Sequence, residues 1–481
     1  MQSRRDQVQA HLFVMSRLAS GMLRADPDAP DSPAARTGRG HLIGIAVSLL
    51  LALVVTVYGL LRPGGATGWA KPGTLVVADE SGARYLFLGG ELRPVLNRAS
   101  ARLVAGDRLT VQRVSERSLA GAVRGAPVGI VGAPEGLPAA AGLRKPDPWL
   151  ACTVQQPARA GESPARLALA IGRPREGVRL TEGQALLAGT PDGTVYLLWS
   201  GQRLRADTAN GALQALGYTG AVPTPVGPAF LNAVPAGPDL ASPPVDGRGE
   251  PGPVLAAGPT RLGQLFTGPG DGRYVLTRAG LEPLTPTLFE LLRGDPRTQR
   301  LAYQGGPVAP VALGPDDLAR HPAAAAGRPA LPARPPTLVV AGQGKAVCAE
   351  SRPAAHTSTT TIAVLDADSV AGRPPAAQPG VRPACAPADT VLVRPGGGAL
   401  VRAESGAGTG STRYLVTDAG VRYALPSDEA VERLGYKGVA PAAVPAPLLG
   451  LLPSGPPLDP GLLTGLAGAA PSPDAGNRCE N

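Results

Sequence analysis

The sequence predicts a single-pass membrane protein whose large C-terminal part is an α+β domain built from repeats. Two observations predict this fold class. One long, uncharged apolar segment lies near the N-terminus, and a strand, turn, strand and helix-like pattern then occurs four times. The chain is therefore expected to divide into a short tail, one membrane span and an outer domain.

The N-terminal tail, residues 1–41, predicts an amphipathic helix followed by a linker. Residues 1–23 place an apolar stripe at three- and four-residue spacing, which includes Val8, Leu12, Met15 and Met22. A lone helix of this length is marginal in water, so we expect the stripe to rest on a partner or the membrane. The alternative is a loosely ordered tail. Ala25–Gly40 is polar and interrupted by proline, which is typical of a linker.

The apolar segment Leu42–Leu61 holds no charged residue. About 20 apolar residues at ~1.5 Å rise cross a hydrocarbon layer of ~30 Å, so residues 42–61 predict a membrane helix. A buried core helix or a cleaved signal peptide are the alternatives. The segment is long for a signal peptide, and a 41-residue tail precedes it.

The cysteines and the flanking charges indicate the orientation of the span. All 4 cysteines follow it, which is typical of an oxidising compartment, and the arginines before it slightly favour a cytoplasmic N-terminus. We therefore expect a cytoplasmic N-terminus and an extracytoplasmic C-terminal domain at the cell membrane.

The charge distribution limits the classes of partner. The net charge is +9, and residues 1–41 account for +2 through six arginines and four aspartates. The remaining +7 could favour an anionic envelope polymer or a lipid surface. Lys and Arg do not form a dense cluster, so a nucleic-acid partner is not expected.

Four segments share the repeat pattern: Gly73–Asp107, Ala185–Leu204, Leu262–Leu284 and Ala399–Leu425. Each second strand carries a tyrosine, namely Tyr85, Tyr196, Tyr274 and Tyr414. Helix-like stretches follow at Asn97–Leu103, Asn210–Leu216, Pro286–Arg293 and Asp428–Leu434. Thr285 and Ser427 stand where helix caps belong. The pattern predicts four β-hairpin/helix repeats.

The repeats form two related halves. Leu-Gly-Tyr-x-Gly follows both the second and the fourth repeat, and the strand-rich segments Pro148–Gly172 and Gly344–Asp368 each contain a cysteine. This order predicts a duplicated core with a quasi-two-fold axis. The expected parts after the span are 62–145 (repeat 1), 146–180 (core half 1), 181–243 (repeat 2), 244–258 (linker), 259–335 (repeat 3), 336–372 (core half 2), 373–388 (linker), 389–464 (repeat 4) and 465–481 (a flexible tail).

The cysteines in the two core segments occupy equivalent places. Equivalent residues near a two-fold axis face each other, so we expect a disulfide between Cys152 and Cys348. Two separate buried thiols are the alternative. Cys385 and Cys479 can form a second disulfide by elimination.

The sequence contains no recognisable enzymatic motif. The four histidines have no zinc-ligand spacing, and neither a Gly-x-Ser-x-Gly elbow nor a Gly-x₄-Gly-Lys-Ser/Thr loop occurs. The nearest phosphate-loop candidates are Gly268–Gly272, which reads as a hairpin turn, and Gly342–Lys345, which lacks the hydroxyl residue. We therefore assign no catalytic, cofactor or metal residue and expect no enzymatic activity.

The chain resembles EccB, a membrane component of the type VII (ESX-type) secretion machinery of actinobacteria. The resemblance rests on Ser3–Pro30, on the span with its exit Gly59–Gly65, on Glu91–Val104 and on the repeat order. It implies an elongated, propeller-like outer domain around a central core, and self-association of outer domains. It also implies assembly with the EccC ATPase, EccD and EccE. Some family members are described as ATPases, but no residue here matches such a site.

The resemblance favours a structural subunit of a complex that exports small helical proteins, driven by a partner ATPase. Two alternatives remain: an ATP-hydrolysing component of the same system, which would bind ATP, and an envelope-anchored ligand-binding module.

Overall fold

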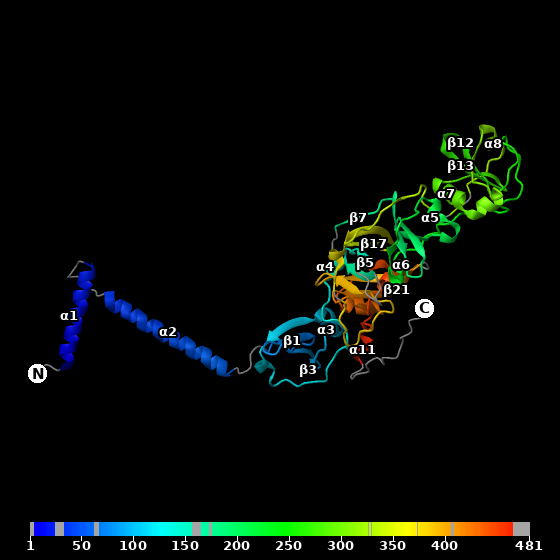
Figure 1. The fold of residues 1–481 in the computed structure, drawn as a ribbon. Helices are drawn as coiled ribbons and strands as arrows, with labels where there is room; N and C mark the ends of the chain where they lie inside the picture. The colour runs from blue at the N-terminus through cyan, green and yellow to red at the C-terminus, as the bar shows by residue number, and fades with distance from the viewer. Residues whose placement is uncertain are drawn as a thin grey trace. The chain divides into compact units, whose positions relative to one another are not determined.

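The computed structural model describes residues 4–24, 33–61, 67–155, 165–172, 176–325, 327–328, 330–372, 374–405 and 408–464. By its contacts the chain forms two compact units. One unit comprises residues 1–71, 76–84 and 111–123, and the other comprises the remainder. Figure 1 shows the described elements as a ribbon and labels many of them.

Two long helices come first in the chain. Helix α1 is Arg4–Arg24, close to the predicted tail helix, and α2 is Pro33–Leu61. The expectation of a linker through Gly40 was wrong for residues 33–40, which are helical. Pro33 occupies the first position of α2, where a proline costs no hydrogen bond and its fixed φ suits a helix.

Four of the five sheets share one strand order, in which the predicted hairpin gains an outer strand on each side. The first sheet contains β3 (Glu91–Pro94), β2 (Arg84–Leu88), β1 (Thr74–Ala78) and β4 (Thr110–Val114). The second contains β10 (Gln202–Arg205), β9 (Val195–Trp199), β8 (Gln184–Gly189) and β11 (Thr224–Pro225), with β16 (Thr337–Leu338) also paired to β8.

The third and fourth sheets follow the same order. The third contains β14 (Gly280–Pro283), β13 (Gly272–Thr277), β12 (Leu265–Gly268) and β15 (Val311–Ala312). The fourth contains β22 (Arg422–Leu425), β21 (Gly408–Thr417), β20 (Gly398–Ser405) and β23 (Ala442–Pro445). In sheets two to four the last strand runs parallel to its neighbour. Each of the four sheets is open, so the propeller-like arrangement stays a prediction.

Short helices follow the hairpins, and their caps explain where they begin. These helices are α3 (Arg98–Ala105), α5 (Ala212–Ala215), α7 (Pro286–Gly294) and α9 (Asp428–Arg433). The Thr285 side chain accepts a hydrogen bond from the N–H of Leu288, and Ser427 accepts one from Ala430, so both predicted caps are confirmed. The predicted helix over Asn210–Leu216 is broken, because Gly211 adopts a left-handed conformation with φ 75°.

The remaining helices are short: α4 (Ala140–Leu143), α6 (Pro228–Ala233), α8 (Pro315–Arg320), α10 (Ala446–Gly450) and α11 (Gly461–Thr464). Helices α6 and α10 follow the second and fourth sheets in the chain, and they contact each other. These two helices stand at corresponding places in the two sequence halves, and the quasi-two-fold arrangement stays a prediction.

The fifth sheet joins the two core segments. Its order is β19 (Thr390–Val393), β6 (Ala165–Ile171), β5 (Trp149–Gln155), β17 (Lys345–Pro353), β18 (Ser358–Asp366) and β7 (Gly177–Arg179). Successive side chains of a strand point to opposite faces. Trp149 and Ala151 pack with Phe230 of α6 and Leu448 of α10, whereas Cys152 packs on the other face. This sheet is the centre of the larger unit.

Candidate functional site

Helix α2 provides the described chain's only candidate membrane span. Its apolar segment Thr37–Gly59 is long enough to cross a bilayer, and its residues are exposed rather than packed in the protein. The hydroxyl of Thr56 donates to the backbone oxygen of Ala52 at 2.7 Å, so this polar group is satisfied within the helix. Every side of this helix is therefore free to contact lipid or another membrane helix.

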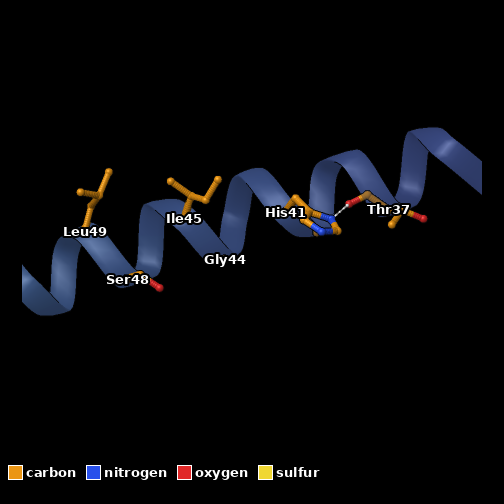
Figure 2. Close-up of a pocket in the computed structure, with 7 residues that line it drawn as sticks. Thr37, His41, Gly44, Ile45, Ser48 and Leu49 are labelled. Carbon is orange, nitrogen blue, oxygen red and sulfur yellow. Dashed lines mark hydrogen bonds between the residues drawn. The ribbon is translucent and has the colours of Figure 1, made fainter.

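One face of α2 carries small residues at four-residue spacing. Gly40, Gly44 and Ser48 line a shallow hollow together with Ile45 and Leu49. Figure 2 shows Gly44, Ile45, Ser48 and Leu49 along the helix. Small residues at this spacing let a second helix approach closely in a membrane. Sequence reasoning missed this face, although the Gly-x₃-Gly-x₃-Ser spacing was present as a signal.

The apolar stripe of α1 is exposed. Val8, Leu12, Met15 and Met22 are 58%, 62%, 54% and 85% exposed, which is unusual for large apolar side chains. The spacing of these residues places them on one face of the helix. Their role as a partner-binding surface stays a prediction.

Cys152 and Cys348 form a disulfide between β5 and β17, the two middle strands of the fifth sheet. They face each other across β5 and β17, and both are fully buried. The bond links residues 196 apart in the sequence and joins the two core segments. Burial keeps it from solvent thiols, so we interpret it as structural. The predicted pairing of Cys385 with Cys479 involves a residue outside the described part of the chain, and it stays a prediction.

A buried carboxylate ties the edge of the core sheet to its centre. Glu350 on β17 accepts hydrogen bonds from Arg179 on β7 at 2.7 and 3.0 Å, and from Arg352 at 3.0 Å. Burial alone raises the pKa of Glu350, but the two guanidinium groups outweigh it and lower the pKa. Arg179 thus reaches past β18 and holds the short strand β7.

Two equivalent tyrosines connect the halves reciprocally. Tyr218 donates a hydrogen bond to the carbonyl of Pro336, just before β16, and Tyr436 donates one to Pro138, before β5. Both tyrosines belong to the Leu-Gly-Tyr-x-Gly motif. In each half, the tyrosine therefore binds the segment of chain that precedes the core strands of the other half. Sequence reasoning identified the motif but not these partners.

The phosphate-loop candidates lie in turns that lead into strands. Gly268–Gly272 connects β12 to β13, and Gly342 precedes β17. The ammonium group of Lys345 pairs with Asp366 at 2.6 Å. A phosphate-binding loop needs a helix N-terminus behind it, which these two turns lack. Among the described residues no group of three or more His, Cys, Asp or Glu is placed to hold a metal ion.

The comparisons with known proteins agree with one another. The sequence model of the family described as "Type VII secretion system ESX-1, transport TM domain B" matches residues 1–462. The chain belongs to this family, the EccB proteins. It is 30% identical to the protein named ESX-3 secretion system ATPase EccB3 of Mycolicibacterium smegmatis, over 95% of this chain and 89% of that protein. It is 28% identical to the ESX-1 secretion system ATPase EccB1 of Mycobacterium tuberculosis, over 94% and 92%.

Solved structures show the same fold. The structure titled as an intact ESX-5 inner membrane complex contains a chain that matches with a TM-score of 0.63 and 24% identity, covering 96% of this chain and 95% of that one. An EccB3 dimer from the ESX-3 core complex matches with a TM-score of 0.61 and 26% identity, covering 81% and 99%. The EccB assignment thus holds for sequence and fold.

Proposed function

We propose that this chain is a structural subunit of a type VII secretion membrane complex that exports small helical proteins. The observation that carries the proposal is the pair of exposed N-terminal surfaces: the apolar stripe of α1 and the small-residue face of α2. Both surfaces fit other helices, and neither is covered by the described part of this chain. A subunit whose main role is assembly needs such surfaces.

The expected partners are the other membrane subunits of the complex. A chain of the same fold occurs in an ESX-5 inner membrane complex, and EccB3 forms a dimer in the ESX-3 core complex. We infer that this chain assembles with an EccC-type ATPase, with EccD and EccE, and with a second copy of itself. The tail helix then lies in the cytoplasm, and the repeats and core form the extracytoplasmic part. Labelling of a Gln9→Cys variant by an impermeant thiol reagent in intact cells would contradict this orientation.

The second candidate function is ATP hydrolysis, which the printed names of several relatives suggest. The argument against it is local. Lys345 is held by Asp366, and both glycine-rich turns continue as strands. We therefore assign the energy source to a partner subunit.

ATP turnover by the purified full-length chain tests the choice between the two functions. We expect no turnover above that of a mock preparation. A rate proportional to chain concentration that Lys345→Ala abolishes, while Lys437→Ala preserves it, would overturn the scaffold assignment. Both lysines are exposed and pair with one carboxylate, so Lys437→Ala is the matched control.

A further inference from the structure

Basic side chains that form no ion pair with a described residue lie on the first sheet and beside it: Arg113 is on β4, Lys71 precedes β1 and Arg117 follows β4. We define the juxtamembrane patch as Lys71, Val111, Arg113 and Arg117, which are all exposed. None of the three basic residues forms an ion pair with another described residue, whereas Arg93 pairs with Glu91 and Arg102 with Asp107. The patch therefore offers free positive charge.

Strand β4 presents an apolar and a basic side chain together. Alternation along a strand puts Val111 and Arg113 on one face and Thr110, Gln112 and Val114 on the other. Thr110 at the start of the strand is exposed, Gln112 is half-buried and Val114 is buried, so the second face turns inward only towards the end of the strand. Val111 is 55% exposed on the outward face.

The acidic residues near the patch lie beyond the end of β4. The N–H of Asp79 donates to Val114, the last residue of the strand, and Glu80 accepts a hydrogen bond from the N–H of Glu116. Val111 and Arg113 precede this end, whereas Arg117 lies beyond it, next to Glu116 in the chain. The carboxylates therefore do not neutralise the strand's basic side chain by direct pairing.

Chain connectivity keeps the patch near the bilayer. Helix α2 ends at Leu61 and β1 begins at Thr74, so residues 62–73 are the only connection. At ~3.3–3.6 Å per residue this tether spans at most about 40 Å. A weak attraction suffices for a surface held at such a short range, because the tether supplies a high local concentration of lipid.

We propose that the juxtamembrane patch binds the anionic phospholipid surface of the membrane that α2 spans. The guanidinium and ammonium groups contact lipid phosphates, and Val111 enters the headgroup region. Basic side chains near an anionic surface and a nearby apolar side chain are the two contributions that reversible membrane attachment uses. The first sheet then rests on the bilayer and limits the rotation of the outer domain.

The test uses the full chain reconstituted in vesicles, with a Val111→Cys variant carrying an environment-sensitive fluorophore. The fluorophore emission should shift to the blue in vesicles of phosphatidylcholine with phosphatidylglycerol, and remain that of water in phosphatidylcholine alone. High salt should reverse the shift, because exposed charges are screened. A Val254→Cys variant is the matched control, because Val254 is 73% exposed in a segment far along the chain.

Reversing the charge of the patch distinguishes binding to anionic lipid from binding to another partner. Arg113→Glu with Arg117→Glu should abolish the shift at position 111, while the Val254→Cys signal and the Cys152–Cys348 disulfide remain unchanged. The proposal is wrong if the emission at position 111 is equal in both kinds of vesicle. It is equally wrong if the shift follows protein density rather than lipid charge, which would indicate a second copy, or if it survives charge reversal.

Discussion

Cys152 and Cys348 stand directly opposite each other in the antiparallel pair of β5 and β17, and a disulfide joins them. They belong to equivalent segments of the two sequence halves. The bond therefore lies where the halves meet, and it closes a loop with a sequence separation of 196.

Removal of this disulfide should destabilise the core. Replacing both cysteines by Ala is expected to lower the free energy of unfolding by about 2–5 kcal/mol, because a long loop gains entropy in the unfolded chain. Denaturant unfolding of the full-length chain in detergent, followed by the fluorescence of the buried Trp149, measures the loss. Unchanged stability, or free Cys152 in peptide maps of protein from the envelope, would contradict the structural role.

The buried Asp295 should make the chain sensitive to acid. Asp295 is fully buried, and it accepts hydrogen bonds from Arg248 at 2.8 Å and from Arg297 at 2.9 Å. Burial raises the pKa of Asp295, but the hydrogen bonds from Arg297 and Arg248 outweigh this and lower it to about 2. Arg248 also donates to Pro243, so the network anchors the segment between the halves.

The sign of the pH effect follows from this lowered pKa. The folded chain favours the ionised form of Asp295, so ionisation stabilises the fold. This contribution to the free energy of unfolding is complete above the ordinary pKa near 4 and disappears as the pH falls towards 2. Asp295→Asn should lower the free energy of unfolding by about 3 kcal/mol at neutral pH. The stability of this variant should also fall less as the pH is lowered into the acid range. Thermal melts from pH 7 to pH 2.5 measure both effects. Asp316→Asn, on an exposed carboxylate, is the control and should change little.

The hydrogen bonds donated by Tyr218 and Tyr436 should contribute equally to the free energy of unfolding. Tyr218→Phe and Tyr436→Phe each leave a buried proline carbonyl without its donor, at a cost of about 1–2 kcal/mol. Burial also raises the pKa of Tyr218 to about 12, so this hydroxyl remains a donor at neutral pH. Denaturant unfolding of both variants, with Tyr196→Phe as the control, tests the duplication. A large effect at one position and none at the other would contradict it.

Local signals in the sequence were sufficient for much of the fold. The second strand predicted around Tyr85 is observed as β2, and the caps Thr285 and Ser427 are observed, because each depends on residues close in the chain. The outer strands of the sheets were missed. β11 and β15 have two residues each and pair in parallel across a long connection, so they leave no alternating pattern.

The candidate site was predicted less completely. The apolar stripe of α1 could be predicted from the helical spacing of its residues. The pairing of Cys152 with Cys348 could be predicted from their equivalent places in the two sequence halves. The small-residue face of α2 was missed because Gly40 was assigned to a linker. The salt bridge between Arg179 and Glu350 joins residues 171 apart, and only the assembled sheet brings them together.

Assembly of the membrane complex tests the central claim most directly. A chain with Leu12→Asp and Met15→Asp places two charges in the apolar stripe, where burial against a partner would cost several kcal/mol. Ala10→Asp adds a charge on the opposite side of α1 and serves as the control. The size of the detergent-solubilised complex is measured for each variant. We predict that the double variant is lost from the complex, keeps its Cys152–Cys348 disulfide and no longer supports secretion, while Ala10→Asp behaves as the unaltered chain. Incorporation of the double variant into a complex of unchanged size would contradict the account.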